Sequence, residues 1–77
     1  MLIKIEFEDY WQDFLTWVID TEKESIVECE PFQADIWVGK VVTQKDFEVG
    51  GKVTFIDTNG DSLQIQYPIE SIEILAL

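Results

Sequence analysis

The sequence predicts a mainly β fold, either a small, strongly bent antiparallel sheet or a small barrel, with about five or six strands. Two observations predict it. Short runs rich in isoleucine, valine and aromatic residues recur along the 77 residues, separated by polar segments and glycines. Residues 2–7 also alternate apolar and polar side chains, as a strand with one buried face does. A chain of this length is expected to form a single domain, residues 1–77.

The N-terminal half is expected to contain three strands. The first spans residues 2–7, and the next two, 16–19 and 25–29, form a hairpin across a polar connection. Residues 9–15 form either one short helix, indicated by a capping-box pattern and apolar i,i+4 pairs, or a bent strand. Pro31 is expected to end the third strand, because proline cannot donate a hydrogen bond to a sheet.

The second half is expected to add a strand, a hairpin and a final strand. Residues 36–42 read as an apolar strand in which Gly39 marks a bulge or a bend. A loop over 43–51 then leads to the hairpin. After the hairpin, residues 68–71 have the pattern of a single 3₁₀ turn, and residues 72–75 form the last strand.

The hairpin over residues 52–67 has two candidate registers. A two-residue Asn-Gly turn would place Phe55 opposite Gln64 and so mix apolar and polar side chains on each face. A three-residue loop ending at Gly60 pairs Phe55 with Leu63 instead and keeps the two faces distinct. This loop also places the glycine where a positive φ is needed. The sequence therefore predicts the three-residue loop.

The charge of the chain is strongly negative and unevenly distributed. Sixteen acidic residues against five lysines give a net charge of −11, and there is no histidine or arginine. Residues 1–35 hold ten of the acids with two lysines, and residues 36–77 hold six acids with three lysines. The first 35 residues therefore carry most of the negative charge.

These features exclude several classes of function. Without histidine there is no ordinary proton shuttle near neutral pH, and without arginine no bidentate phosphate clamp, so we expect no enzyme and no catalytic or cofactor-binding residues. Residues 57–61 superficially resemble the start of a calcium loop, but the predicted hairpin explains them, and no metal site is expected. Five lysines cannot form a basic stripe, so direct nucleic-acid binding and membrane-surface binding are not expected.

Cys29 is the one cysteine, and we expect it to be a small buried hydrophobe whose thiol pKa is raised by adjacent carboxylates. A lone cysteine forms no internal disulfide, which favours a cytoplasmic location. The apolar runs are also much shorter than the ~20 residues needed to span a bilayer.

The order of elements expected from residue 50 to residue 75 resembles the closing half of SH3-like and Sm-like small β-barrels. That order is loop, strand, tight hairpin, strand, proline-started turn and final strand. The resemblance is architectural and covers about a third of the chain. It implies a small barrel and carries no functional residues, because barrels of this kind support many unrelated activities.

In size, acidity and lack of catalytic side chains, the chain is also similar to small acidic inhibitor proteins of phages and mobile elements. Such proteins block CRISPR effectors, restriction enzymes or DNA repair. This similarity implies an anti-CRISPR or other anti-defence protein that mimics nucleic acid and occupies the binding site of a basic nucleic-acid-binding enzyme or effector.

Acidic residues spaced i,i+2 place both carboxylates on one face of a strand, roughly 6.6 Å apart, and so imitate a phosphate backbone. We expect partner contacts from such residues and from an aromatic anchor. The expected contact residues are Glu22, Glu24, Glu28, Glu30 and Asp35, with Trp37 or Trp11 as the anchor. Three alternatives stay open: an acidic surface that only keeps the chain soluble, a small β-barrel adaptor or assembly subunit acting through aromatic and strand-edge contacts, and a homodimer.

Overall fold

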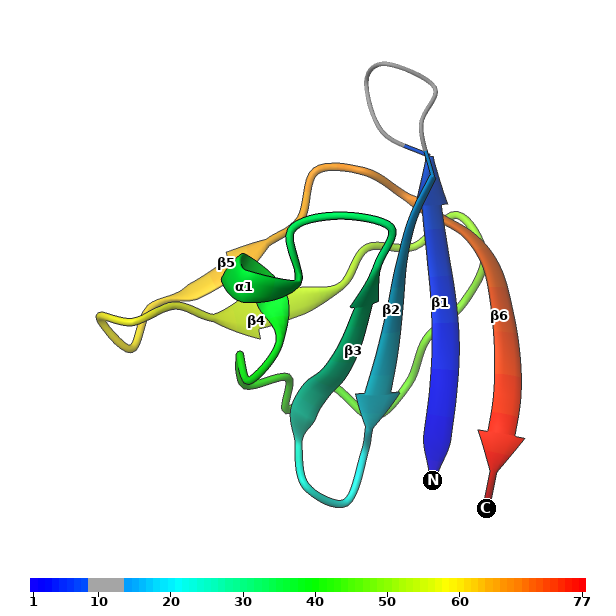
Figure 1. Cartoon of the computed structure of the whole chain (residues 1–77), viewed down its shortest axis with the longest axis horizontal. Coiled ribbons are helices and arrows are strands. Elements are labelled where there is room, and N and C mark those ends of the chain that lie inside the picture. Colours follow the sequence, from blue (N-terminus) through cyan, green and yellow to red (C-terminus); the bar gives the residue numbers. More distant parts are fainter. Residues whose placement is uncertain (9–13) are drawn as a thin grey trace.

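The computed structural model describes residues 1–8 and 14–77 and confirms the mainly β fold (Figure 1). Its elements in chain order are β1 (Leu2–Glu8), β2 (Phe14–Asp20), β3 (Ser25–Glu30), α1 (Ala34–Trp37), β4 (Thr54–Ile56), β5 (Ser62–Gln64) and β6 (Ile69–Ala76). The six strands form two antiparallel sheets, one of four strands in the order β3-β2-β1-β6 and one of two strands, β4-β5.

The first strand lies inside the larger sheet because its residues alternate so regularly. Ile3, Ile5 and Phe7 are all buried, whereas the lysine and glutamate between them point to the opposite face. The pairing of β1 with its neighbours continues this division, since Ile5 lies opposite Trp17 of β2 and Ile72 of β6. The sheet therefore has one face on the core and one face toward solvent.

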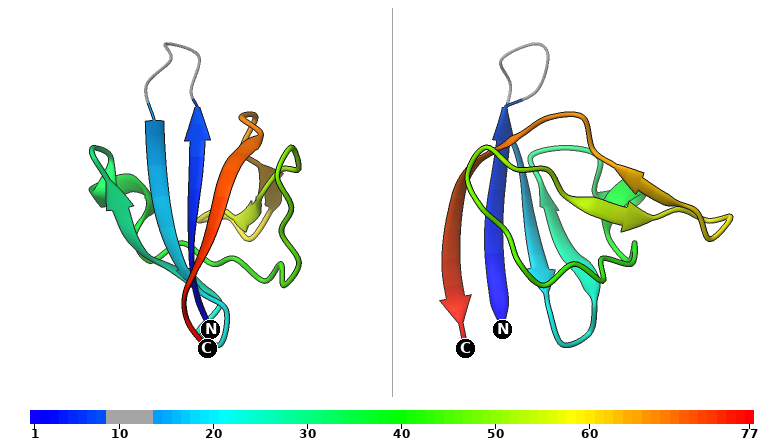
Figure 2. Two further views of the ribbon diagram at one scale, coloured as in Figure 1. Left: turned by 90° about the vertical axis from the view of Figure 1, so that its right-hand side faces the viewer. Right: turned by 180° about the vertical axis from the view of Figure 1, so that it is seen from behind.

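A short segment after α1 connects the two sheets. Val41 forms isolated bridges with Ser25 of β3 and with Ile56 of β4. Farther along the chain, the loop at residues 50–51 is joined to the start of β6. Ile69 accepts a hydrogen bond from the Gly50 N–H and donates one to the Gly51 carbonyl, both 2.8 Å long. Residues 43–51 thus run from the β3 side of the sheet to the start of β6 (Figure 2). The strands in the described part of the chain do not close into a barrel.

The core lies between the inner face of the larger sheet and the β4-β5 hairpin. Trp17 is fully buried at its centre, and its ring packs edge-on against Phe7 at a centroid distance of 4.9 Å. Trp37 from α1 packs on the other side at 4.8 Å and in turn contacts Phe55 of β4 at 5.1 Å. Four aromatic rings therefore connect the two sheets through the helix.

The prediction of a strand over 36–42 is wrong, because Val41 alone in this range forms β-bridges and these are isolated. Residues 34–37 form α1, and Gln33 before it adopts a left-handed conformation with φ 68°. Trp37 packs against the core from this helical turn, while Ile36 and Val38 on either side of it stay exposed. Gly39, with φ 94°, does mark a bend, and residues 39–42 then run beside β3.

The prediction of a 3₁₀ turn over 68–71 is also wrong. Ile69 already belongs to β6, where it is 2% exposed and lies opposite Phe7 of β1. Its hydrogen bonds to Gly50 and Gly51 hold it in an extended conformation. Burial of this isoleucine and pairing on both sides therefore override the local turn preference of Pro68.

The alternatives for residues 9–15 are decided only in part. Residues 9–13 lie outside the described residues, while Phe14 and Leu15 belong to β2 and are not helical. The strand expected over 16–19 therefore begins two residues earlier. The hairpin that β2 forms with β3 is confirmed.

The three-residue register of the last hairpin is confirmed, although its strands are shorter than predicted. Phe55 lies opposite Leu63, and the Gly60 N–H donates to the Asp57 carbonyl at 3.0 Å. The Asp57 carboxylate also accepts from the N–H of Asn59 and of Asp61, both at 2.9 Å, and so fixes the turn.

Gly60 has a φ of 86°, a conformation that side chains with a Cβ atom rarely adopt. We predict that Gly60→Ala lowers the free energy of unfolding by about 1 kcal/mol and that Gly60→Asn costs less, because asparagine tolerates a positive φ. Urea unfolding checks this, with Thr58→Ala in the same exposed turn as the control. Equal midpoints for the wild type and Gly60→Ala would contradict the predicted turn geometry.

Candidate functional site

The solvent face of the four-stranded sheet, here called the outer face, collects acidic side chains from three strands. Apart from Asp20, which begins the turn after β2, its charged residues include Lys4 and Glu6 from β1, Glu28 and Glu30 from β3, and Glu73 from β6. They share this face because each alternates with side chains directed at the core. Four carboxylates and one ammonium group therefore gather on one side of one sheet.

The strand register arranges these residues in two rows that cross the sheet. One row runs Glu28, Val18, Lys4, Glu73, and the neighbouring row runs Glu30, Thr16, Glu6, Ser71. Adjacent positions in a row are about 4.8 Å apart. The carboxylates thus stand at the ends of the first row and alternate with hydroxyls in the second.

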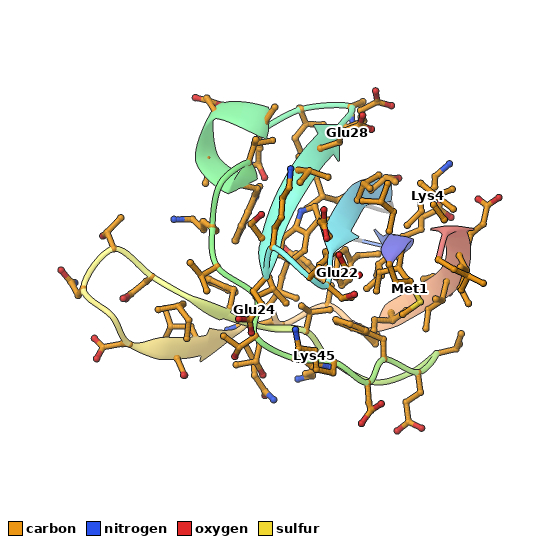
Figure 3. The ribbon with its side chains drawn as sticks, turned by 90° about the horizontal axis from the view of Figure 1, so that it is seen from below. Met1, Lys4, Glu22, Glu24, Glu28 and Lys45 are labelled. Carbon is orange, nitrogen blue, oxygen red and sulfur yellow. The ribbon has the colours of Figure 1, made fainter. Side chains whose placement is uncertain are left out.

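The sequence-predicted contact residues divide into separate groups. Glu28 and Glu30 lie together on the outer face, as their spacing predicted. Glu22 and Glu24 instead lie in the turn between β2 and β3, apart from Glu28 (Figure 3). Glu24 has a φ of 55° and pairs with Lys45, whose Nζ lies 3.5 Å from the carboxylate. The structure therefore brings two of the four glutamates together on the sheet and leaves the other two at the turn.

The remaining predicted contact residues lie on or near other elements. Asp35 is exposed in the first turn of α1. Trp37 is half-buried, and its indole N–H donates to the Gln33 side-chain oxygen at 3.1 Å. Its ring belongs to the aromatic contacts of the core, so little of it is free to act as an anchor. Trp11 lies outside the described residues.

Several residues of the outer face were absent from the predicted contact set, among them Lys4, Glu6, Glu73 and Leu75. Glu73 joins it only because β6 pairs with β1, a contact between the two ends of the sequence. Leu75 follows on the same strand, next to an irregularity between the pairs Ile3–Ile74 and Leu2–Ala76. Strand alternation alone could have placed both on the polar side of the last strand, but not on the same sheet face as Glu28.

A shallow groove of about 170 Å³ runs along this outer face. The residues that line it are Lys4, Thr16, Val18, Glu28, Glu30 and Leu75. Val18 is only 8% exposed although it faces solvent, because its cross-strand neighbours are the long side chains of Lys4 and Glu28. Leu75 is 47% exposed. The groove thus combines an apolar floor with a charged rim.

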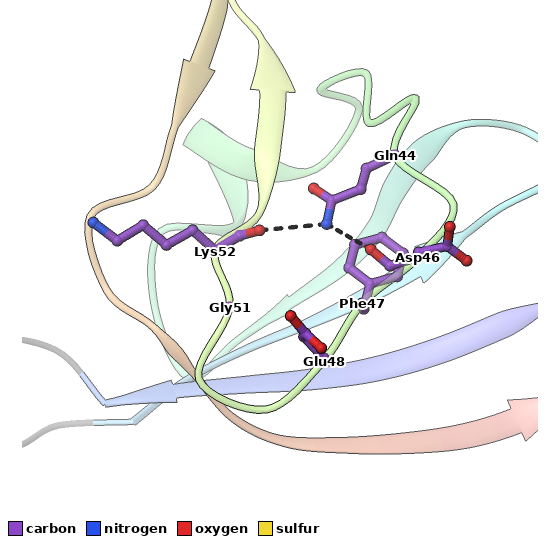
Figure 4. A pocket seen from close by; sticks show the side chains of 6 residues that line it. All are labelled: Gln44, Asp46, Phe47, Glu48, Gly51 and Lys52. Carbon is purple, nitrogen blue, oxygen red and sulfur yellow. Dashed lines mark hydrogen bonds between the residues drawn. The ribbon is translucent and has the colours of Figure 1, made fainter.

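A second hollow, beside residues 44–52, is explained by loop structure (Figure 4). The Gln44 amide donates to the Asp46 carbonyl at 2.7 Å and to the Lys52 carbonyl at 3.3 Å, and its oxygen accepts from the Thr54 N–H at 2.9 Å. These bonds use the polar groups of the Gln44 amide to hold the loop in place.

Cys29 is buried beside Trp17, its cross-strand partner, as expected for a small hydrophobe. Burial is the main cause that raises the pKa of its thiol, and the charge of Glu30 adds to the effect. The thiol also lies 3.3 Å from the Phe32 carbonyl. A protonated, buried thiol is a poor nucleophile.

Residues 1–8 and 14–77 contain no group of three or more carboxylate or thiol side chains placed to hold a metal ion. Within the same ranges, no helix is both long and apolar enough to cross a membrane.

The chain was compared with protein-family models, with curated proteins and with solved structures, and none of the three comparisons finds a match.

The turn beside Glu22 gives a pH-dependent contribution to stability. The Asp20 carboxylate accepts hydrogen bonds from the N–H of Lys23 and of Glu22, and mainly the first lowers its pKa below the usual 3.8. The resulting stabilisation is present above pH 3.8 and is lost as the pH falls through the lower, folded-state pKa.

We predict that Asp20→Asn reduces the loss of stability between about pH 5 and about pH 2. Urea midpoints measured across this range check it, and parallel pH profiles for the two proteins would contradict it.

Proposed function

We propose that this chain is a non-catalytic binding protein that presents the outer face of its four-stranded sheet to a basic protein. In this proposal the partner is a nucleic-acid-binding enzyme or effector, and the chain inhibits it by occupying the site that nucleic acid would use. The observation that carries the proposal is the gathering of Glu6, Glu28, Glu30 and Glu73 on one sheet face.

The electrostatics of the whole chain support such a partner. A net charge of −11 attracts basic surfaces from a distance and speeds their association. Glu28 and Glu30 leave β3 roughly 6.6 Å apart, and Glu30 and Glu6 stand two strands or about 10 Å apart, so negative charge recurs along this face as it does along a nucleic-acid backbone. The sheet fixes the backbone positions of these residues, so little backbone order has to be gained on binding.

The narrower proposal is an anti-CRISPR or other anti-defence inhibitor. It rests on the general similarity of small size, acidity and absence of histidine and arginine to inhibitors of that kind. The proposed place of action is the cytoplasm, where such targets work.

The second candidate is an adaptor or assembly subunit, related in architecture to SH3-like barrels, that binds through apolar surface and strand edges. The observation that favours it is exposed apolar surface on β6, where Ile74 is 58% and Leu75 47% exposed. Two irregularities in the pairing of β6 with β1, together with Glu70 and Glu73, make this edge less suited to adding a further strand. We therefore place the adaptor, and a homodimer formed through the same edge, second.

Two double variants test the proposal, because each removes two negative charges from the chain. We predict that Glu28→Gln/Glu30→Gln weakens partner binding by about 5- to 30-fold at low salt, since it alters the outer face. Glu22→Gln/Glu24→Gln, which alters the turn, is expected to change binding by less than about threefold. Partners are captured from a host-cell lysate, identified by mass spectrometry and then measured singly by biolayer interferometry.

Competition and salt distinguish the two candidates. The proposal predicts that captured partners are basic nucleic-acid-binding proteins, that added DNA releases them, and that binding weakens steeply as salt is raised. Binding that neither DNA nor salt affects, or a light-scattering mass showing only self-association, would reject the mimic in favour of the adaptor or the homodimer.

A further inference from the structure

We infer that the groove on the outer face binds one long cationic side chain, an arginine or a lysine, from the protein partner. The inference rests on the proposed function and makes it more specific. It names the place where a single partner residue is held, in addition to the general attraction of the acidic surface.

The floor of the groove fits the aliphatic part of such a side chain. Val18 and Leu75 are both apolar and line the same groove, although they come from strands that are not adjacent in the sheet. Leu75 lies next to the irregularity in the pairing of β6 with β1, and irregularities of this kind commonly direct a side chain toward a binding site. A leucine that is 47% exposed among carboxylates is thus placed to contact the methylene groups of an incoming lysine or arginine.

The rim of the groove fits the charged end. Glu28 and Glu30 are two residues apart on one face of β3, so their side chains leave the strand roughly 6.6 Å apart. A cation placed between them therefore lies within ion-pair distance of both. The groove volume of about 170 Å³ is several times the space of one water molecule and accommodates the end of one side chain.

Charge complementarity favours a cation over other occupants. An apolar side chain in the groove would remove water from the two glutamates without replacing their hydrogen bonds. An anion would meet repulsion from four carboxylates on the same face. Lys4, which lines the groove, makes no ion pair with the described carboxylates, so these groups stay open to an external cation.

The test uses three fluorescein-labelled peptides of nearly equal charge: hexa-arginine, hexa-lysine and a hexamer of 2,4-diaminobutyric acid, whose side chain is two methylene groups shorter than that of lysine. Fluorescence anisotropy gives their affinities for the wild type and for three variants. The variants are Leu75→Ala, Glu28→Gln/Glu30→Gln, and Asp35→Asn/Glu48→Gln, which removes the same charge outside the groove. Leu63→Ala, at an exposed leucine of β5, is the control for losing an apolar side chain.

The inference predicts that Leu75→Ala weakens the binding of the two long-chain peptides about threefold or more and leaves the binding of the short one unchanged. Only the long aliphatic side chains reach the apolar floor of the groove. Glu28→Gln/Glu30→Gln should weaken hexa-arginine about 3- to 10-fold, and Asp35→Asn/Glu48→Gln less than twofold. Leu63→Ala should have no effect. The ratio of the hexa-arginine and hexa-lysine affinities shows which cation fits better.

The inference is overturned if Glu28→Gln/Glu30→Gln and Asp35→Asn/Glu48→Gln weaken hexa-arginine binding equally. It is also overturned if Leu75→Ala affects the binding of the long and the short peptides to the same extent. The acidic surface would then act through its overall field, and the proposed function would survive. If peptide binding depends on the groove residues but the chain captures no partner that DNA releases, the groove is supported and the proposed function is rejected. The circular dichroism spectrum of each variant shows that it is folded.

Discussion

Burial of the Trp17 ring is the packing contact on which the other elements depend. Trp17 contacts Phe7 within the larger sheet and Trp37 from α1, and Trp37 extends the contact to Phe55 of the smaller sheet. The Trp17 indole N–H has no oxygen or nitrogen partner among the described residues, which costs about 1–3 kcal/mol. Burying an aromatic side chain of this size contributes about 4–6 kcal/mol and outweighs that cost. For this arrangement to persist, α1 and the hairpin must stay packed on the sheet.

This packing also determines the composition of the outer face. In a strand, the side chains beside a buried residue point the other way, so the register that buries Trp17 turns Thr16 and Val18 to the outer face. The same register sets Glu28 beside Val18, and Val18 beside Lys4. A shift of one residue in either strand would bury carboxylates and abolish both the core and the acidic face. Folding stability and the proposed binding surface therefore depend on the same strand pairing.

The features that the sequence predicted correctly are those with a local cause. Alternation identified β1, β-branched runs identified the hairpin that follows, and turn chemistry identified the loop ending at Gly60. For the candidate site, the spacing of Glu28 and Glu30 correctly placed both on one strand face. The errors arise where a distant contact decides the structure. Ile69 is extended because Gly50, Gly51 and the first strand hold it, and the helix at α1 places an aromatic ring in the core. Neither contact leaves a periodic signal in the sequence, and the same is true of the pairing that brings Glu73 onto the outer face.

The central claim is that the aromatic rings from β1, β2, α1 and β4 form one continuous contact behind the acidic face. Nuclear Overhauser effects between the ring protons of Trp17, Trp37 and Phe55 in an isotope-labelled sample test it most directly. The account predicts strong effects from Trp17 to Trp37 and from Trp37 to Phe55, because their ring centroids lie 4.8 and 5.1 Å apart. Effects confined to Trp17 and Phe7, with none to Trp37, would contradict it, because α1 and the second sheet would then not pack on the first.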